Sequence, residues 1–278
     1  MTQFDLFNFD FDKDSFESKS RDNGFTYWYA SELSAMLGYT NLKTFDKAVN
    51  KAMTTCNTLN IPIFENFEQI QRVENEKTFN DFKLSRFACY LAVMNADNKM
   101  PIVAAAQAYF ATLAGAVNNY LAEADNVERL VIRDEVSERE KSLSGVVHVR
   151  GIVNYGYFQN QGYRGMYNKN IQQLKQLRKV DNGRTLLDFM GKEELAANLF
   201  RITQTELKIK QENISGQIPL ENAAYSVGRK VRDTMIEISN VKPEDLTTQQ
   251  DIKKVKSNLK SKSKEMKKID SKKQKKDK

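Results

Sequence analysis

The chain of 278 residues carries a formal net charge of +7, and 40% of its residues are hydrophobic. A length beyond the roughly 100–200 residues of one domain, with enough apolar side chains for real cores, predicts two domains followed by a tail. The charge is unevenly placed, because residues 251–278 hold 13 lysines against four acids, a net of +9, and residues 1–250 carry about −2. The high isoelectric point therefore belongs to the tail, which argues against a strongly basic folded body.

Several functional classes are disfavoured by composition. No run approaches the roughly 20 apolar residues of a membrane helix, and the acidic, aromatic start MTQFDLFNFDFDKD is unlike a signal peptide, so we expect a cytoplasmic protein with no membrane association. Cys56 and Cys89 form no CxxC pair, and the single His148 has no cysteine partner. We therefore expect no metal, no cofactor and no catalytic residues.

The first predicted elements lie in residues 1–38. Residues 1–24 are expected to be flexible. Aromatic or aliphatic residues alternate with polar ones in FDLFNFDF, however, so an edge strand is the alternative there. FTYWYA, residues 25–30, predicts a short strand. Ser31 is expected to cap the following helix and Gly38 to end it.

A second helix is predicted from about Leu42 to Cys56, with Lys43, Lys47 and Lys51 facing outward. A helix, a glycine turn and another helix form the outline of a helix-turn-helix, in which the second helix enters the major groove. A basic face that is merely solvated remains the alternative, because paired amphipathic helices are common.

The densest apolar segment, residues 83–111, predicts two buried helices at 84–96 and 101–118, with Pro101 favoured at a helix start. Before it, residues 67–73 and 78–84 predict a β-hairpin. These elements complete a small α+β domain over residues 25–120.

Residues 121–144 predict a charged linker helix, with a dimer seam as the alternative. The next segment, 144–170, contains five glycines among tyrosines and phenylalanines. We expect a glycine-kinked hairpin there. In the alternative, the aromatic rings stack on bases, and Arg150 and Arg164 beside them bind bases or phosphate.

The second domain, about 145–240, is expected to be mostly α-helical. The helices expected after the glycine-rich segment are 171–179, 186–189, 193–211 and 220–238. The lysine-rich tail, 241–278, permits a helical start, but beyond Met266 it has too little apolar surface to fold. Its lysines, including Lys253 and Lys254, are expected to bind polyanions in a salt-dependent way.

Several motifs carry a resemblance over almost the whole chain. They are YWYASELSAMLGYTNLKTFDKAVNKAM, DFKLSRFACYLAVMNADNKMPIVAAAQAYFA, LSGVVHVRGI, GYRGMYN and KPEDLTTQQDIKKVKSNLKS. Together these segments resemble the DinD (DNA-damage-inducible protein D) family, whose N-terminal part is a Bro-N domain. The chain departs from the family pattern at Ser31, where arginine is usual, and at Lys43 and Thr44, near a usual tryptophan.

The resemblance implies a non-enzymatic, nucleoid-associated accessory protein of the SOS response that modulates RecA-type recombinase filaments on single-stranded DNA. Bro-N domains elsewhere imply the alternative, a DNA-binding transcriptional regulator or phage-type antirepressor. The partners implied are a recombinase filament, DNA or both, and the sequence leaves a homodimer open. The residues expected to bind a partner or nucleic acid are Lys43, Lys47, Lys51, Arg86, Arg150, Arg164, Lys253 and Lys254.

Overall fold

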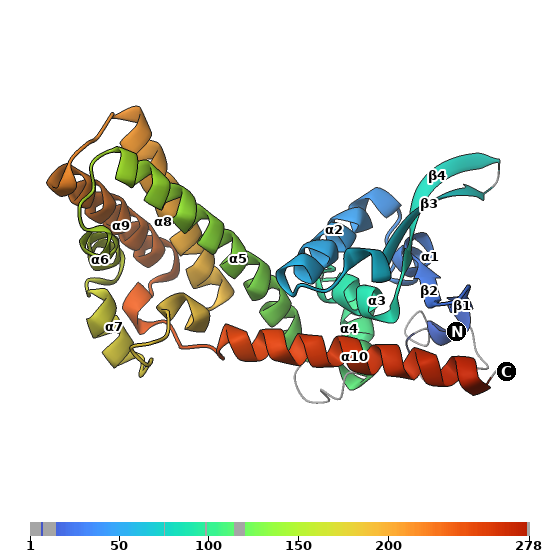
Figure 1. Ribbon diagram of the computed structural model, residues 1–278. Coiled ribbons are helices and arrows are strands. Elements are labelled where there is room, and N and C mark those ends of the chain that lie inside the picture. Colours follow the sequence, from blue (N-terminus) through green and yellow to red (C-terminus); the bar gives the residue numbers. More distant parts are fainter. Residues whose placement is uncertain (1–6, 8–14, 75, 98, 114–119, 277–278) are drawn as a thin grey trace. The chain divides into compact units, whose positions relative to one another are not determined.

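A computed structural model describes residues 7, 15–74, 76–97, 99–113 and 120–276 (Figure 1). The chain divides into two compact units, of which the first combines residues 1–131 with 255–278 and the second comprises residues 132–254. The first unit contains a small antiparallel sheet with helices and the second is helical in its described residues, so the predicted α+β class is confirmed.

The sheet of the first unit has the strand order β1-β2-β4-β3. Its strands are β1 (Arg21–Asp22), β2 (Thr26–Tyr29), β3 (Phe67–Glu74) and β4 (Lys77–Leu84). The predicted hairpin is confirmed, because β3 and β4 pair in antiparallel register from Phe67 opposite Leu84 to Glu74 opposite Lys77. The expected edge strand in FDLFNFDF lies outside the described residues, apart from Phe7.

The helices of the first unit surround an apolar core. They are α1 (Ala30–Met36), α2 (Leu42–Thr58), α3 (Arg86–Met94), α4 (Pro101–Leu113), the first part of α5 (Tyr120–Val149) and the greater part of α10 (Ile252–Lys276). Every residue of α3 is buried, as expected for the centre of a core. Ser85 caps α3 by accepting a hydrogen bond from the Ala88 amide at 3.1 Å.

Ser31 does not cap the helix that it was expected to cap. Tyr29 occupies that position without a side-chain hydrogen bond, and Ser31 lies inside α1. Its hydroxyl donates to the fully buried Asp81 at 2.5 Å and accepts from Arg72 at 2.9 Å. A buried carboxylate is costly unless it accepts hydrogen bonds. Ser31 therefore donates to Asp81 and does not cap the helix. Gly38 does end the helical segment, with φ of +84°.

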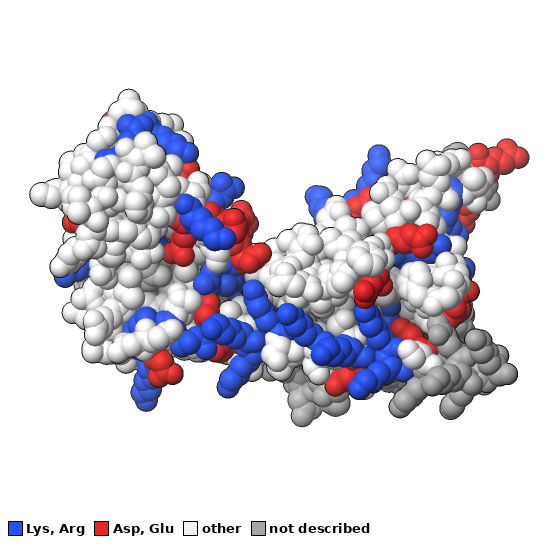
Figure 2. Space-filling view, in the orientation of Figure 1, with Lys and Arg blue, Asp and Glu red and all other residues white. Residues whose placement is uncertain are grey.

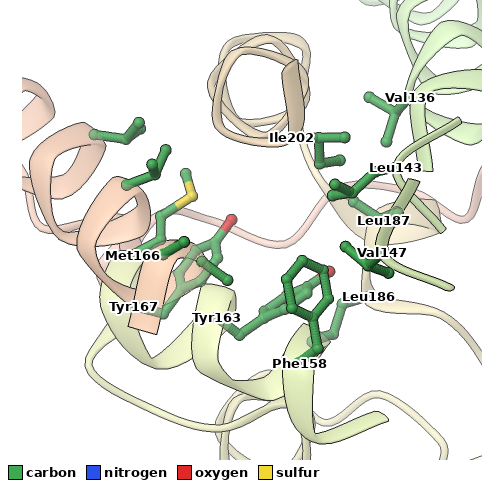
Figure 3. Packing of buried hydrophobic residues seen from close by; sticks show 14 of the residues in the cluster. Val136, Leu143, Val147, Phe158, Tyr163, Met166, Tyr167, Leu186, Leu187 and Ile202 are labelled. Atoms are coloured by element: carbon green, nitrogen blue, oxygen red, sulfur yellow. The ribbon is translucent and has the colours of Figure 1, made fainter. Parts of the chain in front are cut away.

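The second unit contains most of α5 (Tyr120–Val149) and four further helices, α6 (Tyr155–Tyr167), α7 (Ile171–Leu177), α8 (Lys192–Gln211) and α9 (Gln217–Ser239). Its core draws on α5, α6, α8, α9 and the 3-10 helix η4 (Leu186–Phe189). The labelled side chains in Figure 3 belong to this cluster, and Phe158, Tyr163, Met166 and Tyr167 among them come from α6.

The expected glycine-kinked hairpin in residues 144–170 is wrong, because the segment forms the end of α5 and the whole of α6. A Cβ on Gly165 would lie 2.3 Å from the Tyr225 carbonyl oxygen, and one on Gly228 would lie 2.5 Å from the Gly162 carbonyl oxygen. The glycines therefore allow the α6 and α9 backbones to touch, which is a requirement of helix packing and not of a turn.

Candidate nucleic-acid interface

The first group of predicted binding residues lies on α2. Asn41 caps this helix by accepting a hydrogen bond from the Lys43 amide at 2.9 Å, and Phe45 and Val49 are buried. Lys43, Lys47 and Lys51 are exposed, because a turn of 3.6 residues places them away from the buried stripe. The three ammonium groups therefore form a basic face on one helix, as expected.

The second group lies on α10, where the expected unfolded end is wrong: the helix continues to Lys276. Ile252, Val255, Leu259 and Met266 are all buried, and their spacing of three, four and seven residues aligns them on one side of the helix. This apolar stripe supplies the burial that offsets the mutual repulsion of the lysines.

The opposite side of α10 forms a continuous basic surface, visible as the blue side chains that follow the helix in Figure 2. We name this surface the α10 lysine face; its exposed residues in the first unit are Lys260, Lys264, Lys267 and Lys268. Lys253 and Lys254 are also exposed, in the first turn of the helix, which belongs to the second unit. Lys267 also pairs with Glu65 at 2.5 Å. Because the helix is anchored along its other side, these charges are held in a fixed array and not on a flexible tail.

Arg86 is part of this anchor. Its side chain is 1% exposed, and its Nε donates to Asp270 of α10 at 2.7 Å. Its other guanidinium nitrogens donate to Glu17, and the guanidinium lies 4.7 Å from the centre of the Trp28 ring. The sequence left two roles open for Arg86, contact with a partner or a bond to a carboxylate in the core. Its burial and its contacts with Glu17 and Asp270 favour the second role, in which it holds α10 on the first unit.

The charges around Arg86 shift two pKa values. Burial lowers the pKa of the Arg86 guanidinium, but the bonds and charges of Glu17 and Asp270 outweigh it, and the net direction is upward. The Tyr109 hydroxyl donates to Glu17 at 2.6 Å, and burial together with that carboxylate raises the pKa of Tyr109. Both groups therefore keep their protons at neutral pH, so the network persists there.

The remaining predicted residues, Arg150 and Arg164, belong to the second unit. Arg150 follows α5 and donates to the Asn213 side chain at 3.3 Å, while its carbonyl accepts from the Gly216 amide at 2.8 Å. Arg164 is exposed on α6. Arg150 thus helps to hold the loop between α8 and α9, and the two arginines lie on separate segments.

Two sets of polar residues were not singled out from the sequence. Lys260, Lys264 and Lys268 were grouped with the other lysines of the tail, although their spacing of four residues is the signal for one helix face. Asn160 and Asn170 are the second set, and both line a pocket of about 450 Å³ between α6 and α7. The amide-rich sequence NKNIQQLKQ was the available signal for it.

Clusters of metal-binding side chains and membrane-spanning helices would indicate two other functional classes. Within the described residues, no three histidine, cysteine, aspartate or glutamate side chains gather closely enough to hold a metal ion. The described helices likewise include none that is long and apolar enough to cross a membrane.

Comparison with known proteins identifies the family. Residues 123–255 match the model of the DinD C-terminal domain. Over 245 residues the chain is 36% identical to DNA damage-inducible protein D of Escherichia coli strain K12, with 82% of this chain and 88% of the relative covered. The alignment extends well beyond the C-terminal domain, and the chain belongs to the DinD family.

Proposed function

We propose that the protein is an accessory factor of the DNA-damage response that modulates RecA-type recombinase filaments on single-stranded DNA without catalysis of its own. Membership of the DinD family supports a role linked to DNA damage. Nucleic acid is proposed as a partner because of the α10 lysine face. This face is an exposed array of lysines on a helix whose opposite side is buried.

The chemistry of this face favours contact with phosphate. Lysine ammonium groups release counterions when they neutralise phosphates, and such contacts carry no sequence information. Residues 1–250 have a net charge of about −2, so most of the attraction comes from α10. In the proposed role, the lysines bind the phosphates of any single strand. Specificity for the filament comes from contacts with the recombinase that coats the strand.

A second candidate function rests on the basic face of α2. α1 and α2 are separated by a turn containing Gly38, and Lys43, Lys47 and Lys51 are exposed on the second helix. In this alternative the first unit is a Bro-N-type DNA-binding regulator or antirepressor that reads duplex DNA through α2. The Bro-N assignment of residues 25–120 stays a prediction.

Matched triple substitutions separate the two functions. Deleting residues 251–278 would remove buried side chains of the first unit, so charge must be removed by substitution. One variant carries K260Q, K264Q and K268Q on α10, and the other carries K43Q, K47Q and K51Q on α2. Both lose three exposed positive charges and no buried atom, so each serves as the control for the other.

The experiment is a binding titration against duplex DNA, bare single-stranded DNA and single-stranded DNA coated with a RecA-type recombinase, at two salt concentrations. We expect the α10 variant to weaken binding to the single-stranded ligands and to reduce the salt slope by about 2, since each lost contact contributes roughly 0.7. The α2 variant should bind as the wild type does. Preferential binding to one duplex sequence, lost only in the α2 variant, would overturn the proposal in favour of the regulator.

A further inference from the structure

The pocket between α6 and α7 contains hydrogen-bond donors that the structure holds in place. It has a volume of about 450 Å³, within the range of small-ligand sites. Its lining consists of Gly156, Gln159, Asn160, Asn170, Ile171, Gln172, Lys175 and Asn182. We name it the amide pocket, because five of these eight residues carry a carboxamide side chain.

Two of the amides have a fixed orientation. The Asn160 Oδ1 accepts from the Ile171 backbone amide at 3.0 Å, and the Asn170 Oδ1 accepts from the Gln173 backbone amide at 2.8 Å. A backbone N–H can only donate, so in each side chain the bonded atom must be the oxygen. The Nδ2 groups of Asn160 and Asn170 are therefore left as donors, each with two protons.

The charge of the pocket points to an anionic ligand. Lys175 is the only charged residue among the described residues that line it. Its ammonium donates to the Asn182 carbonyl at 2.7 Å, which places the group and leaves two of its three protons for another acceptor. A ligand that suits this lining presents several acceptor oxygens and a negative charge.

We propose that the amide pocket holds one unpaired nucleotide of single-stranded DNA, with base acceptors bonded to the Nδ2 groups of Asn160 and Asn170 and the phosphate beside Lys175. This inference rests on the proposed function, whose strand-binding role it deepens by adding a base-contacting site in the second unit. Side-chain amides read base edges, and single strands expose those edges when the bases are unstacked. A base in a duplex stays stacked and uses its Watson–Crick edge in pairing, so it cannot enter such a pocket without being unpaired.

Asparagine-to-aspartate substitution provides a test that preserves the fold. In N160D and N170D the carboxylate still accepts from the Ile171 and Gln173 amides, and aspartate is as good a helix cap as asparagine. Only the Nδ2 donors are lost, and a negative charge replaces them. The matched control is N154D, because Asn154 caps α6 by accepting from the Tyr157 amide at 3.1 Å but does not line the pocket.

The probe is an oligothymidylate added to the full chain, followed by the ¹⁵N-labelled side-chain amide resonances and by a binding titration. The resonances missing from N160D and N170D identify the two asparagines, and we expect both to shift when the strand is added. The double variant N160D/N170D should bind at least roughly tenfold more weakly, which corresponds to about 1.4 kcal/mol. N154D should stay within twofold of the wild type.

Three outcomes would overturn the inference. Equal losses in N154D and N160D/N170D would show that added negative charge alone weakens binding. Unchanged binding by N160D/N170D, combined with weak binding by the α10 triple variant, would reject the pocket and leave the proposed function standing. Binding confined to recombinase-coated strands, with no shift of the two amides on bare oligothymidylate, would also reject the pocket as a nucleotide site.

Discussion

Two helix contacts in this protein are built on opposite principles. α10 is joined to the first unit by apolar side chains and by a buried cluster of charges centred on Arg86. α6 and α9 touch through their backbones, with Gly162, Gly165 and Gly228 at the crossing. The contact of α10 is destabilised when a buried charge loses its partner. The contact between α6 and α9 is destabilised when a side-chain atom is added to one of the glycines.

The largest effect is expected from Arg86→Met, which breaks the α10 contact. The substitution leaves the carboxylates of Glu17 and Asp270 without their guanidinium partner, and loss of one member of a buried ion pair costs about 3–5 kcal/mol. Urea unfolding should show this loss in the free energy of unfolding.

Lys264→Met, on the exposed side of α10, is the control and should change the free energy of unfolding by less than about 0.5 kcal/mol. A similar small change for Arg86→Met would show that the buried charge cluster is dispensable and that the apolar stripe alone holds the helix.

The next effect is expected from Gly165→Ala, which tests the other contact. The added methyl group would lie 2.3 Å from the Tyr225 carbonyl oxygen and 2.9 Å from the Arg229 amide nitrogen. Because both obstacles are backbone atoms, α6 and α9 must move apart, at a cost of about 3 kcal/mol. Thermal unfolding measures it, and an unchanged midpoint would mean that the helices do not pack backbone to backbone.

A smaller, pH-dependent effect is expected from Asp251→Asn at the start of α10. The hydrogen bonds donated by Arg184 lower the pKa of Asp251, and asparagine keeps the cap on the Lys253 amide. Since the folded pKa is depressed, the ion pair stabilises the protein above the unfolded pKa of about 3.9 and is lost as the pH falls through the folded value.

We expect Asp251→Asn to destabilise the chain by about 1 kcal/mol at pH 7. Urea unfolding from pH 7 to pH 3 should show this difference shrinking as the pH falls. A difference that is constant with pH would mean that the charge of Asp251 contributes nothing.

The smallest effect is expected from Gly145→Ala, the counterpart of Gly165→Ala. Gly145 lies within α5, and no atom within 4 Å would meet its Cβ. Alanine restricts the unfolded chain and favours the helix, so the variant should be about 0.5–1 kcal/mol more stable than the wild type. Destabilisation in the same thermal experiment would show that this glycine also serves a contact.

The sequence anticipated most of the first unit. The hairpin at β3 and β4 followed from β-forming residues on either side of a polar turn, and α2, α3 and α4 followed from apolar spacing and from Pro101. These signals are local, since turn chemistry and helical periodicity operate over a few residues. The basic face of α2 was predicted for the same reason.

The lysine-rich segment beyond Met266 and the glycine-rich segment were interpreted wrongly for one shared reason. Lysine repulsion disfavours an isolated helix at residues 252–276, and glycine disfavours one at residues 155–167. Each became a helix because a partner distant in sequence was present. For α10 that partner is the core of the first unit, and for α6 it is α9.

The sequence by itself determined the α+β class, the family, the hairpin and the amphipathic stripes, because each of these depends on the order and spacing of residues that are close in sequence. The tertiary structure alone decided that Arg86 is buried against Glu17 and Asp270, that the lysines form one fixed face, and that Asn160 and Asn170 line one pocket. Arg86 lies 69 positions from Glu17 and 184 positions from Asp270, so only packing brings these groups together. The lysines are close in sequence, but their helix is held in place only because its apolar side packs on the first unit.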